Sequence, residues 1–182
     1  MTTLGRTESA LLVIDVQVGV VEDAYRREEA IAAVQLAVEK ARSAHVPVVW
    51  IQHNDEEMPL DSPRWSIVPE LDPRADELHV SKSFKSSFEA TDLETRLAAL
   101  NIGHVYICGA QSDNCVRHTS HAALERGYDV TLVEDAHTTS NFRWDDQLIS
   151  ARHIVNELNH AFYGYEVPGR VTTLVTSAEL AF

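Results

Sequence analysis

The sequence predicts an α/β protein, a three-layer α/β/α sandwich with a central parallel sheet of about five or six strands, formed by a single domain of residues 1–182. Continuous apolar runs without alternation are typical of strands that are covered on both faces. Segments with apolar residues at helical spacing separate these runs, and glycines or polar loops mark the junctions. Strands that alternate with helices build parallel sheets, and a chain of this length can bury one core.

The first half of the chain alternates strand, helix and strand before a long loop. Residues 10–16, ALLVIDV, read as a buried strand, and residues 29–43 repeat apolar side chains at helical spacing. Residues 45–51 form the next strand. The loop over residues 52–77 holds four of the six prolines. Loops of this length are usually lids or binding loops, with an interface element or an interdomain linker as the alternatives.

Two shorter elements precede the centre of the chain. Residues 78–81 predict a short strand. Residues 91–100 predict a helix, and Thr91 followed by Glu94 has the spacing of a capping box at its start.

The centre of the chain reads as a βαβ unit. Residues 104–108 form its first strand, and a helix runs from Cys115 to residue 126. Gly127 then supplies the left-handed residue that commonly ends a helix. Residues 128–134 form the second strand of the unit.

The last third of the chain predicts one loop, one helix and one strand. Residues 135–139 form another loop at a strand end. Residues 145–162 are predicted to be helical, and residues 169–176 close the sheet.

Composition limits the partners and the compartment. The formal net charge is −13 and the pI is near 5.0, a balance that repels nucleic acid and anionic membrane surfaces. Two cysteines make no disulfide framework, and we find no signal-peptide pattern and no run of the ~20 apolar residues that span a bilayer. We therefore expect a cytoplasmic protein whose partner is a small-molecule substrate.

Cys115 is the candidate nucleophile. It stands at a predicted helix start, where unpaired N–H groups and the helix dipole favour thiolate over thiol. The alternative is a small buried residue, since free cysteine is among the most buried types. Cys108, inside an apolar strand, is interpreted as core.

Two further residues share the carboxyl edge of the predicted sheet, where open α/β sheets place their ligands. Asp15 lies near the end of the first strand and Lys82 follows a later one. A carboxylate can take the thiol proton and return it to a leaving amine, and an ammonium group would offset developing charge. The alternatives are a structural carboxylate at Asp15 and, for the lysine, Lys85.

Three segments carry a family resemblance. ALLVIDVQ, the KSFKSSF segment over residues 82–88 and the segment from Gly109 to Val116 resemble the isochorismatase-like cysteine hydrolases in order and spacing, over roughly residues 10–176. The resemblance implies an isochorismatase-like fold with Rossmann-like topology. It also implies that Asp15 is the general base, that Lys82 assists and that Cys115 is the nucleophile.

The resemblance implies further parts of the site. A cis peptide would join Ala110 to Gln111, and the backbone N–H groups of Gln111 and Cys115 would form the oxyanion hole. The substrate pocket would be lined by four side chains, namely Gln17, Trp65, Phe88 and Gln111. The alternative for Trp65 is a loop aromatic that fills the core or a subunit interface.

We expect no cofactor and no metal. Nicotinamidases of this superfamily bind a metal through an Asp-x-His pair, which the stretch from Gln52 to Asp55 lacks. His118 and His121, three residues apart, are a weak metal pattern without further ligands. A Cys115–His118 dyad is a rival mechanism, although a side chain one turn along the same helix reaches the thiol poorly.

The expected activity is cysteine-dependent hydrolysis of an amide or ureido C–N bond in a small molecule, through a thioester. The alternatives are the vinyl-ether hydrolysis of isochorismatases and a non-enzymatic binding protein on the same fold. The resemblance also implies a homodimer or a larger homo-oligomer. Phe162, Tyr163 and Tyr165 are apolar residues that fit such an interface or the core.

Overall fold

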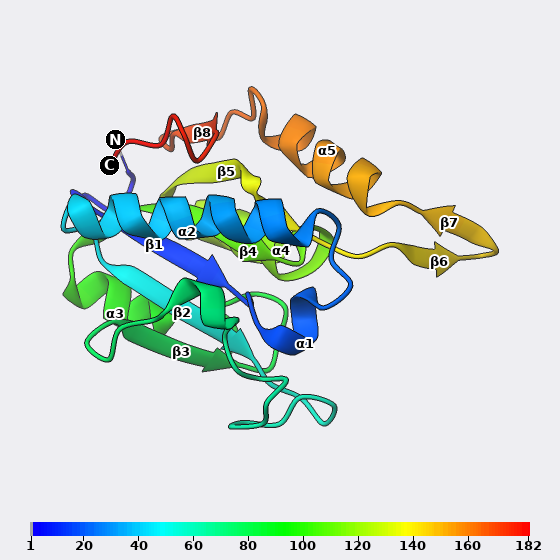
Figure 1. Cartoon of the computed structure of the whole chain (residues 1–182). Coiled ribbons are helices and arrows are strands. Elements are labelled where there is room, and N and C mark those ends of the chain that lie inside the picture. The colour runs from blue at the N-terminus through cyan, green and yellow to red at the C-terminus, as the bar shows by residue number, and fades with distance from the viewer. Residues whose placement is uncertain (1) are drawn as a thin grey trace.

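A six-stranded sheet forms the centre of the computed structural model, which describes residues 2–182 (Figure 1). The strand order is β3-β2-β1-β4-β5-β8, and every neighbouring pair is parallel. The strands are β1 (Glu8–Ile14), β2 (Val48–His53), β3 (Leu78–Lys82), β4 (Ile102–Ala110), β5 (Asp129–Thr138) and β8 (Thr172–Val175). The predicted fold class is confirmed.

Helices cover both faces of this sheet. They are α1 (Val18–Val21), α2 (Arg27–Ser43), α3 (Leu93–Ala99), α4 (Arg117–Glu125) and α5 (Ala151–Phe162), with a 3₁₀ turn at Pro69–Leu71 and a π-helical turn at Ser112–Val116. One apolar cluster joins α2 to the sheet, and a second joins α3, α4 and α5 to the other face. Figure 1 shows α2 lying across its face of the sheet.

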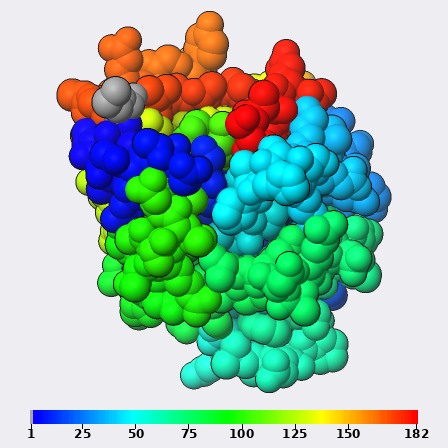
Figure 2. All heavy atoms as spheres, turned by 90° about the vertical axis from the view of Figure 1, so that its left-hand side faces the viewer, coloured from blue at the N-terminus to red at the C-terminus, as the bar shows by residue number. Residues whose placement is uncertain are grey.

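Both chain ends lie at the edge of the sheet where the strands begin (Figure 1). Figure 2 shows this side of the molecule, with the N-terminal segment in blue beside green residues and the C-terminal segment in red beside α2. Asn101 donates to the hydroxyl of Thr7 at 3.0 Å, and Lys40 donates to the carbonyl of Leu180 at 3.0 Å. The candidate site lies at the opposite edge of the sheet, where the strands end.

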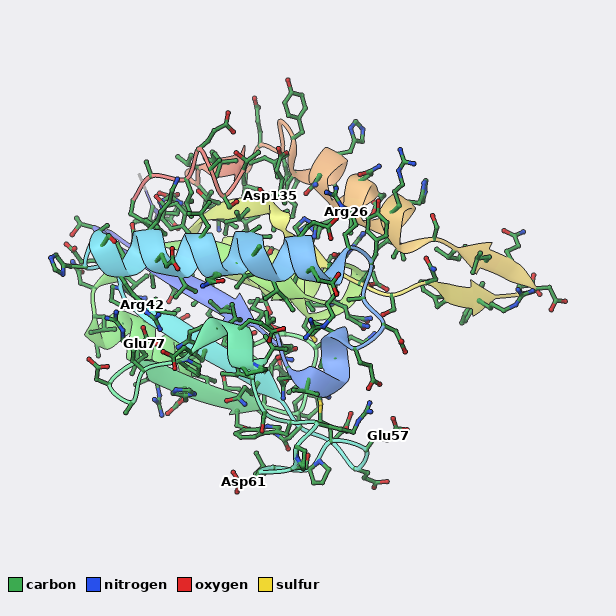
Figure 3. The ribbon with its side chains drawn as sticks, in the orientation of Figure 1. Arg26, Arg42, Glu57, Asp61, Glu77 and Asp135 are labelled. Carbon is green, nitrogen blue, oxygen red and sulfur yellow. The ribbon has the colours of Figure 1, made fainter. Side chains whose placement is uncertain are left out.

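Glu77 anchors the end of the loop over residues 52–77. Its carboxylate accepts hydrogen bonds from Arg42 at 2.7 and 2.9 Å, from the indole of Trp50 at 2.7 Å and from the backbone N–H of Arg74 at 2.8 Å. Figure 3 shows the Arg42 and Glu77 side chains close together. Burial alone would raise the pKa of Glu77, but these donors hold that pKa at about 2. The loop therefore leaves the sheet from a fixed base.

The predicted helix over residues 145–162 is wrong in its first part. Strands β6 (Phe142–Trp144) and β7 (Gln147–Ile149) form an antiparallel hairpin, and α5 begins only after it. Asp145 and Asp146, with φ of 46° and 61°, are both left-handed, as a two-residue hairpin turn requires. Ser150 then caps α5 by accepting the N–H of His153 at 3.3 Å.

The predicted capping box at Thr91 and Glu94 is also wrong. The Thr91 hydroxyl donates to the carbonyl of Ser87 at 2.6 Å, and Glu94 pairs with Arg6 at 3.2 Å. Helix α3 begins at Leu93 without a side-chain cap. Among the described residues, the Thr91 hydroxyl accepts only the N–H of Leu93, at 3.4 Å, and the distant Arg6 holds the Glu94 carboxylate, so the reciprocal bonds of a capping box do not form.

Candidate active site

The sheet brings Asp15, Lys82 and Cys115 together, as predicted. Asp15 follows β1, Lys82 ends β3, and Cys115 lies in the π-helical turn after β4. The Lys82 Nζ atom lies 2.6 Å from Asp15 Oδ2 and donates to Cys115 Sγ at 3.2 Å. The side chains of Lys82 and Asp15 are 0% and 1% exposed, so this ion pair is buried.

The backbone at Asp15 adopts an uncommon conformation. Its φ is 49°, in the left-handed region that few residues other than glycine enter. Its backbone N–H donates to the carbonyl of Ile51 at 2.8 Å, which fixes the Asp15 backbone against β2. Such conformations cost about 1–3 kcal/mol and cluster at functional sites.

Gly109 allows β4 to approach this position. A Cβ on Gly109, whose φ is 119°, would lie 2.0 Å from the carbonyl oxygen of Ile14. Only glycine fits there, because any side chain would push β4 away from β1. This close approach of β4 to β1 explains why the segment that carries Cys115 begins with a glycine at position 109.

Burial changes the expected charge state of the cysteine. Burial and the neighbouring Asp15 carboxylate raise the pKa of the Cys115 thiol to about 12, against the opposing effect of Lys82. The expectation that the helix start favours thiolate is therefore corrected. Burial also raises the pKa of Asp15, although the neighbouring Lys82 and Cys115 oppose that rise. A resting thiol beside a carboxylate of raised pKa suits transfer of the proton between them.

The turn that carries Cys115 is π-helical, whereas the sequence predicted an α-helix from Cys115 onward. The N–H of Val116 donates to the carbonyl of Gln111 at 3.2 Å, five residues earlier, and the α-helix begins only at Arg117. Single π-turns occur frequently at functional sites.

A buried polar chain holds this turn from below. His137 contacts the Ser112 hydroxyl through Nδ1 at 2.8 Å and the Asn159 side-chain oxygen through Nε2 at 2.7 Å. Since the Asn159 amide nitrogen donates to the carbonyl of Glu134 at 3.0 Å, its oxygen accepts from His137 Nε2–H. Nδ1 therefore accepts from Ser112. The loop predicted over residues 135–139 is mostly the end of β5, which positions this histidine.

Two more contacts hold the segment. The Thr139 hydroxyl donates to the Asp113 carboxylate at 2.6 Å, next to the contact between His137 and Ser112. On the other side, the N–H of Ser87 donates to the hydroxyl of Thr119 in α4 at 3.0 Å. The cysteine turn is thus fixed from β5 and from the segment after β3.

The peptide between Ala110 and Gln111 is cis, as predicted. Gln111 lines a pocket of about 510 Å³ at the carboxyl edge of the sheet, together with Asp15 and Cys115. The oxyanion role of the Gln111 and Cys115 N–H groups stays a prediction.

The pocket draws most of its wall from residues that the sequence did not single out for it. The loop over residues 52–77 contributes Asp55, Glu57, Met58 and Arg64, and Figure 3 shows Glu57 on this loop beyond the strand ends. The other lining residues are Gly19, Val20, His53, Ser83, Phe84, Lys85 and Asn114. Most of these follow a strand end, a signal that could have identified them.

Gln17 does not line the pocket, contrary to the prediction. It is fully buried, and its amide nitrogen donates to the carbonyls of His53 at 2.9 Å and Trp65 at 2.7 Å. Its oxygen accepts the N–H of His53 at 2.8 Å. Gln17 therefore holds the end of β2 against the loop, behind the wall of the pocket.

Phe88 and Trp65 are also absent from the pocket lining. Phe88 is 6% exposed and packs in the core, with its ring centroid 5.8 Å from that of Tyr128. Trp65 is half-buried beside the lining residue Arg64. The alternative in which Trp65 fills space inside the protein agrees better with this position.

The rival residues Lys85 and His118 lie apart from the cluster of Asp15, Lys82 and Cys115. Lys85 is exposed at the pocket wall, whereas Lys82 contacts both Asp15 and Cys115. His118 is exposed, and its Nδ1 lies 2.8 Å from the carbonyl of Asn114 in its own helix segment. Within residues 2–182, no group of three or more His, Cys, Asp or Glu side chains is arranged to hold a metal.

These features define a class, an α/β protein in which a buried Asp–Lys ion pair and a half-buried cysteine meet at a pocket on the carboxyl edge of a parallel sheet. The isochorismatase domain model matches residues 9–158, and the chain belongs to this family of hydrolases. In the described part of the chain, no helix has the length and apolarity to cross a membrane.

The comparisons with individual proteins agree with the family. Streptothricin hydrolase of Streptomyces noursei is 33% identical over 136 residues, covering 71% of this chain and 49% of the relative. The chain spans about half the length of the first curated relatives that it matches.

Two solved structures share the fold. An isochorismatase of Pseudomonas putida has a TM-score of 0.86 at 24% identity, covering 96% of this chain and 90% of that one. N-carbamoylsarcosine amidase of Thermoplasma acidophilum has a TM-score of 0.75 at 24% identity, covering 97% and 100%.

Proposed function

We propose that this protein hydrolyses an amide or ureido C–N bond of a small molecule through a thioester on Cys115, without a cofactor. The contact of Lys82 Nζ with both Asp15 and Cys115 carries the proposal. A carboxylate, an ammonium group and a thiol lie close to one another, in a pocket of a size that suits a small molecule, and this supports the proposal.

The acylation step follows from this geometry. Asp15 takes the thiol proton as Cys115 Sγ attacks the carbonyl carbon, and the N–H groups of Gln111 and Cys115 face the developing oxyanion. Asp15 then returns the proton to the leaving nitrogen as the C–N bond breaks. The products of this half are a free amine or ammonia and an acyl thioester.

Water completes the reaction. Asp15 removes a proton from the attacking water, whose oxygen bonds to the thioester carbon. The thiolate leaves, is stabilised by the Lys82 ammonium, and recovers the proton from Asp15. One water is consumed, and the enzyme returns to its starting protonation state.

Two proteins that this chain resembles, streptothricin hydrolase in sequence and N-carbamoylsarcosine amidase in fold, support amide hydrolysis as the reaction. Isochorismatase-type ether hydrolysis needs no thiol, so a thiol in contact with Lys82, whose ammonium also pairs with Asp15, favours the amide reaction over it. We also propose a cytoplasmic location, since both cysteines are free and Cys115 must stay reduced to act.

The test is intact-protein mass spectrometry after brief exposure to a panel of primary amides and ureido compounds. We expect a transient mass gain on the wild type with release of amine or ammonia, and neither result with Cys115→Ala. Cys108→Ala is the matched control, because that buried thiol should not be acylated. Full turnover by Cys115→Ala would refute the mechanism. Isochorismate is tested in parallel, and its cleavage without cleavage of any amide or ureido compound would favour the ether reaction.

A further inference from the structure

His53 lines the pocket beside Asp15 and Cys115 and has no assigned part in the reaction. We propose that His53 Nδ1 accepts a hydrogen bond from an N–H group of the substrate and thereby selects amides and ureido compounds over esters. This inference rests on the proposed function, because it names the feature of the substrate that the same pocket recognises.

The backbone of His53 is held firmly. It is the last residue of β2, and Gln17 binds both its N–H, at 2.8 Å, and its carbonyl, at 2.9 Å. Gln17 is itself fully buried. The imidazole therefore projects from a fixed point at the carboxyl edge of the sheet.

Asp55 determines which ring nitrogen carries the proton. Its Oδ2 lies 3.3 Å from His53 Nε2, while its Oδ1 accepts the N–H groups of Glu57 at 3.0 Å and Met58 at 2.8 Å. A carboxylate can only accept, so the neutral imidazole places its hydrogen on Nε2. Nδ1 then keeps its lone pair.

This lone pair has no partner in the protein. Nδ1 of His53 is buried, and no group within residues 2–182 forms a hydrogen bond with it. A buried acceptor without a donor is unfavourable, and a ligand that supplies the donor gains that interaction. The His53 imidazole also lines the same pocket as Asp15 and Cys115. A ligand held at Nδ1 is therefore near the reacting groups.

The chemistry of an acceptor indicates the substrate class. A primary amide or a ureido group carries N–H donors beside the carbonyl that Cys115 attacks, whereas an ester has none there. A site built to accept such a hydrogen bond rejects an analogue that lacks the donor. The leaving nitrogen, rather than the acyl group, is thus the part of the substrate that His53 recognises.

The first experiment compares primary amides with their methyl esters in wild-type protein, His53→Phe, His53→Asn and the exposed control His153→Phe. We expect His53→Phe to lower kcat/KM for the amide by about 10- to 100-fold, mainly through KM, and to lower kcat/KM for the ester by a much smaller factor. His53→Asn should keep most of the activity, because its side-chain oxygen can lie where Nδ1 was. Equal losses for amide and ester would overturn the proposal.

The second experiment needs no substrate. Nitrogen-15 NMR of the His53 ring at neutral pH should show hydrogen on Nε2 and a bare Nδ1, and Asp55→Asn should weaken this preference. Hydrogen on Nδ1 in the wild type would overturn the proposal. Failure of every amide and ureido compound to react would count against the proposed hydrolysis, while this measurement would still decide the availability of Nδ1.

Discussion

Asp15 and Cys115 affect each other more strongly than their sequence positions indicate. Asp15 is buried and Cys115 is half-buried, and each carries a raised pKa because burial disfavours the charged form. Lys82 opposes both shifts from 2.6 and 3.2 Å. The three groups therefore form one electrostatic unit, and removing the ammonium should change the titration of the other two.

The pH dependence of Lys82→Met tests this coupling. The acid limb of kcat/KM reports the base in the free enzyme, which we assign to Asp15. Without the ammonium the pKa of Asp15 rises further, so the acid limb should move to higher pH, and the rate at neutral pH should fall by about 100-fold or more.

The matched variant Lys85→Met separates the two lysines. Lys85 is exposed and contacts neither Asp15 nor Cys115 among the described hydrogen bonds and ion pairs, so its removal should leave the acid limb in place. A shift of the limb with Lys85→Met but not with Lys82→Met would reverse the assignment.

At the scale of elements, the polar chain from Ser112 through His137 to Asn159 joins the π-helical turn, β5 and α5. Burial lowers the pKa of His137 to about 4, against the raising effects of Asn159 and Asp135. The native protein thus keeps this imidazole neutral at pH values where an unfolded chain, with a histidine pKa of about 6.5, binds a proton.

This difference predicts acid sensitivity. Between about pH 6.5 and pH 4 the unfolded state binds more protons at this position than the native state, so stability rises with pH. Acidification across that window should remove up to about 3 kcal/mol of unfolding free energy. Chemical denaturation at pH 7, 5.5 and 4 measures it.

His137→Gln is the informative variant. This variant should be less stable than the wild type at pH 7, and it should lose less unfolding free energy than the wild type between pH 7 and pH 4. Part of the loss should persist, because burial also lowers the pKa of His104. An unchanged loss in His137→Gln would contradict the assignment to His137.

On the scale of the whole molecule, the β6–β7 hairpin projects away from the body (Figure 1). It exposes Phe142, Trp144 and Leu148 at 41%, 74% and 63%. Phe162 is 1% exposed and belongs to the core, while Tyr163 is 77% exposed. The hairpin is therefore a better candidate than the end of α5 for contact with a second copy of the chain.

We predict a homodimer or larger assembly that buries this hairpin. Trp144→Glu should lower the molar mass measured by light scattering after size exclusion, because a charge would replace the largest exposed apolar side chain of the hairpin. Tyr163→Glu should not change the mass. A wild-type protein that is monomeric at micromolar concentration would contradict the prediction.

The single-domain organisation of the chain also stays a prediction, because the chain spans about half the length of the first curated relatives that it matches.

Patterns within short segments of the sequence were enough to predict the sheet and the reactive side chains of the candidate site. Apolar runs without alternation predicted buried parallel strands, and polar residues at strand ends predicted where Asp15, Lys82 and Cys115 meet. The resemblance added the cis peptide after Ala110, which the structure contains. The apolar runs are local patterns, and the site residues and the cis peptide lie at or just after strand ends. A single short segment of sequence is therefore enough to reveal each of them.

Tertiary structure alone decided the pocket wall and the protonation state of the thiol. Gln17 and Phe88 turn away from the pocket while His53 lines it, and burial outweighs the helix terminus at Cys115. These outcomes depend on segments far apart in the chain, such as residues 17 and 53 or residues 15, 82 and 115, and on how much water their packing excludes. The periodicity of a single segment indicates neither which distant segments meet nor how much water their packing excludes.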